Sequence, residues 1–63
     1  MPAIIMELAP LDKEKKAQLV REVTETTARL TGLPPQAIFV FVKENNLENI
    51  GVGGKLLSDK FQA

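Results

Sequence analysis

Ile38-Phe39-Val40-Phe41-Val42-Lys43 is predicted to form a β-strand, because β-branched and aromatic residues fill it without a glycine or proline. Successive side chains of a strand point to opposite faces. Ile38, Val40 and Val42 would therefore share one face, with Phe39 and Phe41 on the other. Apolar residues on both faces are typical of a strand in a parallel sheet that is covered on both sides. This stretch therefore predicts an α/β fold.

A long helix is predicted before this strand, from about Asp12 to about Leu30. Asp12 is a good N-cap residue, because its carboxylate can accept a hydrogen bond from a free amide of the first turn. Gly32 suits the left-handed position that follows a last helical turn, and Pro34-Pro35 prevents the helix from continuing. These start and stop signals predict one helix between the loop that precedes Asp12 and the segment that begins at Gly32.

The side chains of this helix divide into an apolar and a charged side. The expected apolar stripe consists of Leu19, Val20, Val23, Thr27 and Leu30. On the other side, Arg21 with Glu25, and Glu25 with Arg29, have the i, i+4 spacing of helical ion pairs. We therefore expect the stripe to pack on the sheet and the ion pairs to lie in solvent.

Residues 3–8, Ala-Ile-Ile-Met-Glu-Leu, are predicted to form the first strand. Ile4, Met6 and Leu8 would point to one face of it, and Ala3, Ile5 and Glu7 to the other. Strand, helix and strand make a βαβ unit with a right-handed crossover. One helix covers one face of a two-stranded sheet, so the other face would expose a large apolar patch unless a partner subunit covers it.

The C-terminal part, residues 45–63, contains the run Ile50-Gly51-Val52-Gly53-Gly54-Lys55-Leu56. Glycines so closely spaced predict a tight turn or small hairpin. The backbone amides of a glycine loop can also bind phosphate. The spacing of a P-loop is absent, however, and no helix of useful length is predicted to follow. We therefore expect a structural hairpin and no cofactor.

The composition limits both the fold and the chemistry. The chain has 63 residues with neither cysteine nor histidine. A chain of about this size buries only about 60% of its unfolded surface, and it usually needs disulfides, a metal or partner subunits. Without cysteine and histidine we expect no metal site, so oligomerisation is the remaining source of stability.

The charges and the hydropathy pattern exclude several classes of protein. Eight basic and eight acidic residues cancel, which argues against a nucleic-acid partner. No run of about 20 apolar residues predicts a membrane span, and no signal-peptide pattern precedes the first strand. We therefore expect a single cytoplasmic domain over residues 1–63.

Pro2 is the one candidate for acid–base chemistry. A small residue after the initiator methionine normally permits its removal, which would leave Pro2 with a free secondary amine. An ordinary α-amino group has a pKa of about 8, and apolar burial lowers it toward neutrality, where a general base works best. Such an amine can remove a proton next to a carbonyl, or attack the carbonyl to form an iminium ion. Within a peptide bond, Pro2 would only begin a strand.

Several features along the chain occur together. They are Met1-Pro2 ahead of an apolar strand, the helix segment Leu19-Val20-Arg21-Glu22-Val23, the run 38–44, and Ile50-Gly51-Val52-Gly53-Gly54. In this combination and at this length the chain resembles the 4-oxalocrotonate tautomerase family. The resemblance implies a βαβ protomer with a C-terminal hairpin, two of which form a four-stranded sheet. Short-chain members usually assemble as a hexamer, a trimer of dimers. The N-terminal proline shuttles a proton between carbons of an enol or dienol acid without a cofactor.

The sequence departs from the family where substrate is bound. The best-known members use two arginines to hold the substrate carboxylates and polarise its carbonyl, and those positions fall on Leu11 and Phe39 here. An aromatic residue that shields the proline falls on Ile50. The loop that carries Leu11 is one residue shorter than in the family.

Lysines are the remaining candidates for the missing cations. Lys13 begins the helix beside the loop, and Lys43 and Lys55 flank the second strand and the glycine turn. A lysine is a point charge and does not reproduce the bidentate guanidinium fork. Each of the three is more simply explained as a solvated surface residue.

Three functions are compatible with these residues. The first is a tautomerase of a 2-hydroxy-dienoate or enol-pyruvate-type acid, with Pro2 as general acid/base in a pocket of Leu11, Phe39 and Ile50, some of them from neighbouring subunits. The second is a hydrolytic reaction such as dehalogenation, with Pro2 as a protonated acid; it needs a group to activate water, and Glu7 has no evident role in this. The third is an oligomeric scaffold or binding protein with weak catalysis, which the missing arginines favour.

Overall fold

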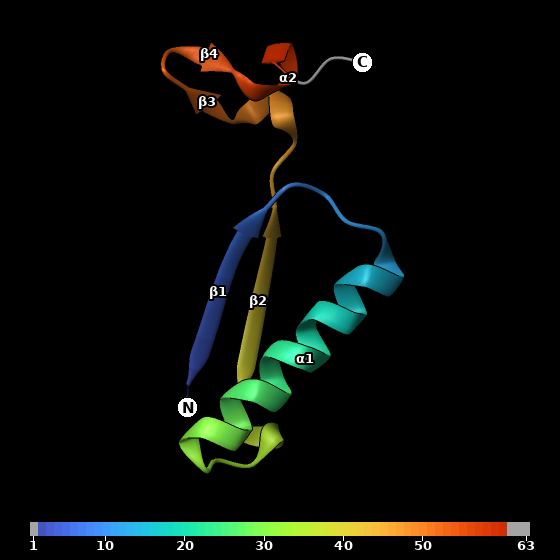
Figure 1. The fold of residues 1–63 in the computed structure, drawn as a ribbon, viewed down its shortest axis with the longest axis vertical. Coiled ribbons are helices and arrows are strands. Elements are labelled where there is room, and N and C mark those ends of the chain that lie inside the picture. The colour runs from blue at the N-terminus through green and yellow to red at the C-terminus, as the bar shows by residue number, and fades with distance from the viewer. Residues whose placement is uncertain (1, 61–63) are drawn as a thin grey trace.

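The computed structural model describes residues 2–60 and shows a βαβ unit followed by a small C-terminal hairpin (Figure 1). In chain order, the elements are β1 (Ala3–Leu8), α1 (Lys13–Thr31), the 3-10 turn η1 (Pro35–Ala37), β2 (Phe39–Glu44), the 3-10 turn η2 (Leu47–Asn49), β3 (Gly51–Val52), β4 (Lys55–Leu56) and α2 (Leu57–Lys60). The predicted α/β class is therefore confirmed.

β1 and β2 pair in parallel, in register from Ala3 opposite Phe39 to Leu8 opposite Glu44. The predicted second strand, 38–43, is one residue too early. The amide of Ile38 donates to the carbonyl of Pro35 at 3.1 Å, so it closes η1 and is not available to the ladder. Ile38 is nevertheless buried, with 8% of its surface exposed.

The termini of α1 follow the predicted signals. Asp12 Oδ1 accepts from the amide of Lys15 at 2.8 Å, which satisfies one free donor of the first turn. Gly32 follows the last turn with φ 75°, in the left-handed region that favours glycine. The predicted helix boundaries, Asp12 and Leu30, are thus correct to within one residue.

The predicted apolar stripe of α1 is correct except at its end. Leu19, Val20, Val23 and Thr27 are half-buried. Leu30 is 72% exposed, so its assignment to the packed stripe is wrong for the single chain. Leu30 lies in the last turn of α1, next to the loop that follows, and no other side chain of residues 2–60 covers it there.

The two faces of the β1–β2 sheet differ in burial. Ile4, Met6, Leu8, Val40 and Val42 are half-buried on the face that α1 covers. Ala3, Ile5, Phe39 and Phe41 alternate with them, and we call these four residues the open face. Ile5 is 72% exposed and Phe41 53% exposed. The alternation predicted for both strands is therefore confirmed, and the open face is uncovered in the single chain.

Residues 45–60 form a C-terminal arm beyond the end of the sheet (Figure 1). In this arm β3 and β4 pair antiparallel across Gly53-Gly54, whose φ values of 62° and 83° correspond to the type I′ turn of tight hairpins. The predicted hairpin is confirmed. The arm makes the chain extended, with a radius of gyration of 15.0 Å, against about 11 Å for a compact domain of this length.

Candidate active site

Pro2 lies directly before β1 and is half-buried. Its carbonyl oxygen accepts a hydrogen bond of 3.0 Å from the amide of Phe39. This bond extends the parallel ladder by one step and fixes the backbone at Pro2 against the start of β2. The structure therefore brings together two of the sequence-predicted site residues, Pro2 and Phe39.

Leu11 and Ile50 lie at the other end of the sheet. Leu11 is in the loop after β1, and Ile50 precedes β3 in the arm. The six residues of β1 separate this end from Pro2, a length of about 20 Å at the usual rise of a strand. A site that combines all four residues therefore requires more than one copy of the chain.

Glu44, the last residue of β2, holds the loop that carries Leu11. Its Oε2 accepts from the amide of Leu11 at 2.8 Å, and its Oε1 accepts from Lys16 Nζ at 2.7 Å. We call these two contacts the Glu44 clamp. The hydrogen bond from Lys16, with that from the Leu11 amide, lowers the pKa of the Glu44 carboxyl below its ordinary value. Sequence reasoning missed this residue, because only the parallel register places Glu44 beside residues so distant along the chain.

Glu7 belongs to a neighbouring cluster at the same end of the sheet. It lies opposite Lys43 in the ladder, with Nζ of Lys43 4.0 Å from its Oε1. The same oxygen accepts from Asn45 Nδ2 at 3.3 Å. Glu7 is thus held at the opposite end of β1 from Pro2 in its own chain.

The lysines considered as replacement cations lie in different surroundings. Lys13 lines an open groove with Lys16, Ala17, Val20 and Arg21. Lys43 is the exposed partner of Glu7, and Lys55 begins β4. Within residues 2–60, no cluster of three or more acidic, histidine or cysteine side chains could hold a metal ion.

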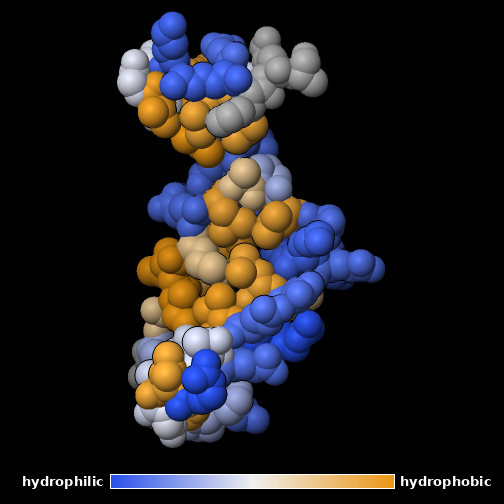
Figure 2. Space-filling model, in the orientation of Figure 1, coloured by the Kyte–Doolittle hydropathy of each residue, from blue (hydrophilic) through white to orange (hydrophobic). Residues whose placement is uncertain are grey.

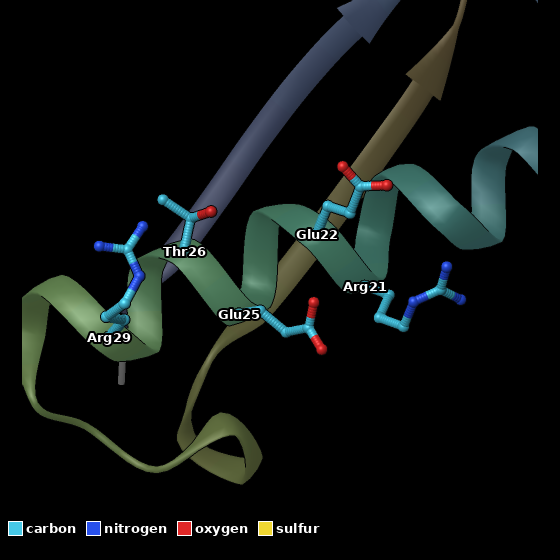
Figure 3. Close-up of a pocket in the computed structure, with 5 residues that line it drawn as sticks. All are labelled: Arg21, Glu22, Glu25, Thr26 and Arg29. Atoms are coloured by element: carbon cyan, nitrogen blue, oxygen red, sulfur yellow. The ribbon is translucent and has the colours of Figure 1, made fainter.

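The charged side of α1 borders a second open groove, away from the sheet (Figure 3). Its lining residues are Arg21, Glu22, Glu25, Thr26 and Arg29. The expected ion pairs of Glu25 with Arg21 and Arg29 are not formed in the part of the chain that the structure describes. The three side chains extend separately into solvent, where an exposed pair has little net free energy to gain.

Apolar surface is concentrated away from this charged side. Figure 2 shows apolar atoms gathered over the strands and again on the arm, whereas polar atoms cover the outer side of α1. On the arm, Val52 is 51% exposed and Leu56 43% exposed. None of the helices in residues 2–60 has the length and apolarity to cross a membrane.

A parallel βαβ unit, a proline ahead of its first strand and a projecting glycine hairpin define a class of small α/β proteins that are completed by other copies. A family model described as "Tautomerase enzyme" matches residues 2–60. The chain therefore belongs to the tautomerase family.

Individual relatives agree with this assignment. A probable tautomerase of Bacillus cereus is 42% identical over 48 residues, which cover 76% of this chain and 79% of the relative. A probable tautomerase of Lactiplantibacillus plantarum is 34% identical over 61 residues, with 95% of each chain covered. The crystal structure of a 4-oxalocrotonate tautomerase homologue is 35% identical and superposes with a TM-score of 0.88, covering 98% of this chain and 100% of that one. The resemblance stated from the motifs is confirmed.

Proposed function

We propose that this protein is a cofactor-independent keto–enol tautomerase of a small 2-hydroxy-dienoate or enol-pyruvate-type acid. Pro2 would be its general acid/base once Met1, which lies outside the described residues, has been removed. The observation that carries the proposal is the placement of Pro2. It is half-buried at the start of β1, and its carbonyl is tied to β2 through Phe39.

The chemistry needs one group that both takes and returns a proton. The neutral secondary amine of Pro2 accepts the hydroxyl proton of the enol, and the electron pair of that O–H bond forms the carbonyl. The electron pair of the carbon–carbon double bond, displaced along the chain in a dienol, forms the new C–H bond as the N–H bond of the protonated amine breaks. The reaction neither oxidises nor reduces the substrate and the amine is regenerated, so no cofactor is required. A correctly placed base of this kind contributes about 10² to 10⁴ in rate.

The remaining parts of the site would come from other copies of the chain. The open face is the surface on which a second sheet would pack, and we propose a homohexamer built as a trimer of dimers, acting in the cytoplasm. Leu11 and Ile50 of neighbouring copies would then line the pocket beside Pro2 and Phe39. These apolar side chains exclude water, while a lysine would hold the substrate carboxylate.

Two measurements on one sample test the proposal. Intact mass shows whether Met1 is removed, and the same protein is assayed for ketonisation of 2-hydroxymuconate and phenylenolpyruvate. Pro2→Ala replaces the secondary amine by a primary one and should lower kcat/KM, whereas protein that retains Met1, in which the nitrogen of Pro2 is an amide, should lose the whole contribution of about 10² to 10⁴. Pro34→Ala, which changes an exposed proline ahead of η1, is the matched control and should retain activity. Wild-type turnover in Pro2→Ala would refute the role of Pro2.

The second candidate function is an oligomeric binding or scaffold protein with weak catalysis. The observation that favours it is the presence of Leu11 and Phe39 where the best-known family members have arginines. Removing one donor that stabilises developing negative charge commonly costs about 10² to 10³ in rate. Processed, assembled protein without turnover of either substrate would favour this function over the tautomerase.

The hydrolytic alternative has less support, because Glu7 is engaged by Lys43 and Asn45 far from Pro2 of its own chain.

A further inference from the structure

Two segments leave the sheet at the same end: the loop between β1 and α1, residues 9–12, and the first residue of the arm, Asn45, which we call the base of the arm. The loop carries Leu11, and the arm begins directly after Glu44 and carries Ile50. If the proposed function holds, both side chains are presented to Pro2 of another copy. Leu11 and Ile50 then line that pocket together only if their positions relative to each other are fixed.

We propose that Glu44 is a positioning residue, which fixes the Leu11 loop to the base of the arm so that Leu11 and Ile50 are presented as one unit. This inference rests on the proposed function, because it assigns Leu11 and Ile50 to the substrate pocket. It goes beyond that function in naming a residue whose partners are Leu11 and Lys16, at the opposite end of the sheet from Pro2 of its own chain.

The contacts of the clamp support this role. Each carboxylate oxygen of Glu44 has its own partner, with Oε2 on the Leu11 amide and Oε1 on Lys16. The loop is therefore fastened at the backbone of Leu11 itself, a residue that stays 36% exposed and can contact a neighbour. One residue further on, Asp12 caps α1 through the amide of Lys15. Two successive residues of the loop are thus held, one to β2 and one to the helix.

The base of the arm is fastened next to the clamp. The amide of Asn45 donates to the carbonyl of Leu8 at 2.8 Å, which continues the β1–β2 ladder. Glu44 thus lies between this bond and the rest of β2, within hydrogen-bonded backbone. Lys16, engaged by Glu44, is also less available than Lys13 to bind a substrate carboxylate, because its charge is already compensated.

The first test measures how strongly the Glu44 clamp protects the Leu11 amide, and it needs no assay of activity. Hydrogen exchange of the Leu11 amide is followed by NMR in the wild type, Glu44→Ala, Glu44→Gln and Glu25→Gln. Glu44→Ala should speed exchange by about tenfold, because the amide loses its acceptor. Glu44→Gln retains an acceptor oxygen and should restore part of the protection. Glu25→Gln removes one negative charge from the groove on the charged side of α1, and it should leave the exchange rate of the Leu11 amide unchanged. Unchanged protection in Glu44→Ala would overturn the inference.

The second test asks whether the clamp serves the site. In the proposed site Leu11 contacts the substrate but takes no part in the proton transfer. Its displacement should therefore raise KM by about three- to tenfold with little change in kcat. Glu44→Ala should show this split, Glu44→Gln should reverse most of it, and the effects of Glu44→Ala and Leu11→Ala should not add. Additive effects, or lost protection with unchanged KM, would overturn the inference. Failure of the proposed function is seen separately, as full turnover in Pro2→Ala.

Discussion

At the scale of single residues, hydrogen bonds to the backbone of Pro2 and of Leu11 hold the candidate site in place. Pro2 is tied through its carbonyl to Phe39, and Leu11 is tied through its amide to Glu44. Such bonds leave the side chains of both loop and strand free for contacts outside the chain. Within the described residues, Glu44 is the one carboxylate that accepts a hydrogen bond from a backbone amide distant in the sequence.

Glu44 should give the protein a pH-dependent part of its stability. Its pKa is lowered from 4.5 in the folded chain, first by the hydrogen bond from Lys16. A carboxyl whose folded pKa is depressed contributes stability above its unfolded pKa, and loses it as the pH falls through the folded value. The wild type should therefore unfold at higher urea than Glu44→Gln at pH 7, and this difference should shrink as the pH falls below 4.5.

The groups that face Glu44 are Lys16 on α1 and the Leu11 amide, with Lys43 and Asn45 flanking it in the chain. Lys16→Met should remove much of the same pH-dependent difference, because it deletes the first cause of the shift. A gap between wild type and Glu44→Gln that is constant from pH 7 to pH 3 would contradict this account.

At the scale of elements, the βαβ unit and the arm are stabilised differently. α1 has caps at both ends and a half-buried stripe on the sheet. The arm has a hairpin of two-residue strands, joined through one type I′ turn, and a two-stranded hairpin alone is marginally stable. The stability of the arm therefore depends on its turn residues and on its contacts with other parts of the assembly.

The two turn glycines should respond differently to substitution. A Cβ at either Gly53 or Gly54 meets nothing within 4 Å, so only the backbone conformation decides the result. Gly53→Asn should be tolerated, since Asn-Gly is a favoured type I′ pair. Gly54→Val should destabilise by about 1–2 kcal/mol, because a β-branched residue is forced to positive φ.

Urea unfolding of both variants at one fixed protein concentration measures this difference. The fixed concentration matters because the stability of an oligomer depends on it. Equal midpoints for Gly53→Asn and Gly54→Val would show that the turn does not form in solution.

At the scale of the whole molecule, the single chain is incomplete. It measures 43 × 24 × 14 Å, its arm extends beyond the sheet, and the open face exposes Ile5, Phe39 and Phe41. An exposed apolar patch of this kind commonly marks a surface of association with another protein. A second copy is the simplest such partner, because the same face is present on every chain.

Ile5→Lys should therefore weaken the assembly. It places a charge among the apolar residues of the open face, where burial without a partner is costly. Loss of an anchor at the centre of an interface raises the dissociation constant by about thirtyfold or more. Sedimentation velocity over a dilution series should show smaller species for Ile5→Lys. Thr26→Lys, in the outer groove of α1, should sediment as the wild type. A wild type that is monomeric throughout the series would refute the assembly.

The sequence by itself determined the elements, because their signals are local. The N-cap at Asp12, the left-handed Gly32 and the Gly53-Gly54 turn each depend on a few neighbouring residues, and each was predicted correctly. The strand faces followed from alternation. The motifs also identified the family, since their combination spans the whole chain.

Only the tertiary structure decided which residues meet. It placed Pro2 and Phe39 together and put Leu11 and Ile50 at the opposite edge of the sheet, because parallel strands begin at one edge and end at the other. It moved the start of β2 past Ile38, whose amide closes η1. It also revealed the Glu44 clamp, which no local pattern signals, since residues distant in sequence become neighbours only through the crossover of the βαβ unit.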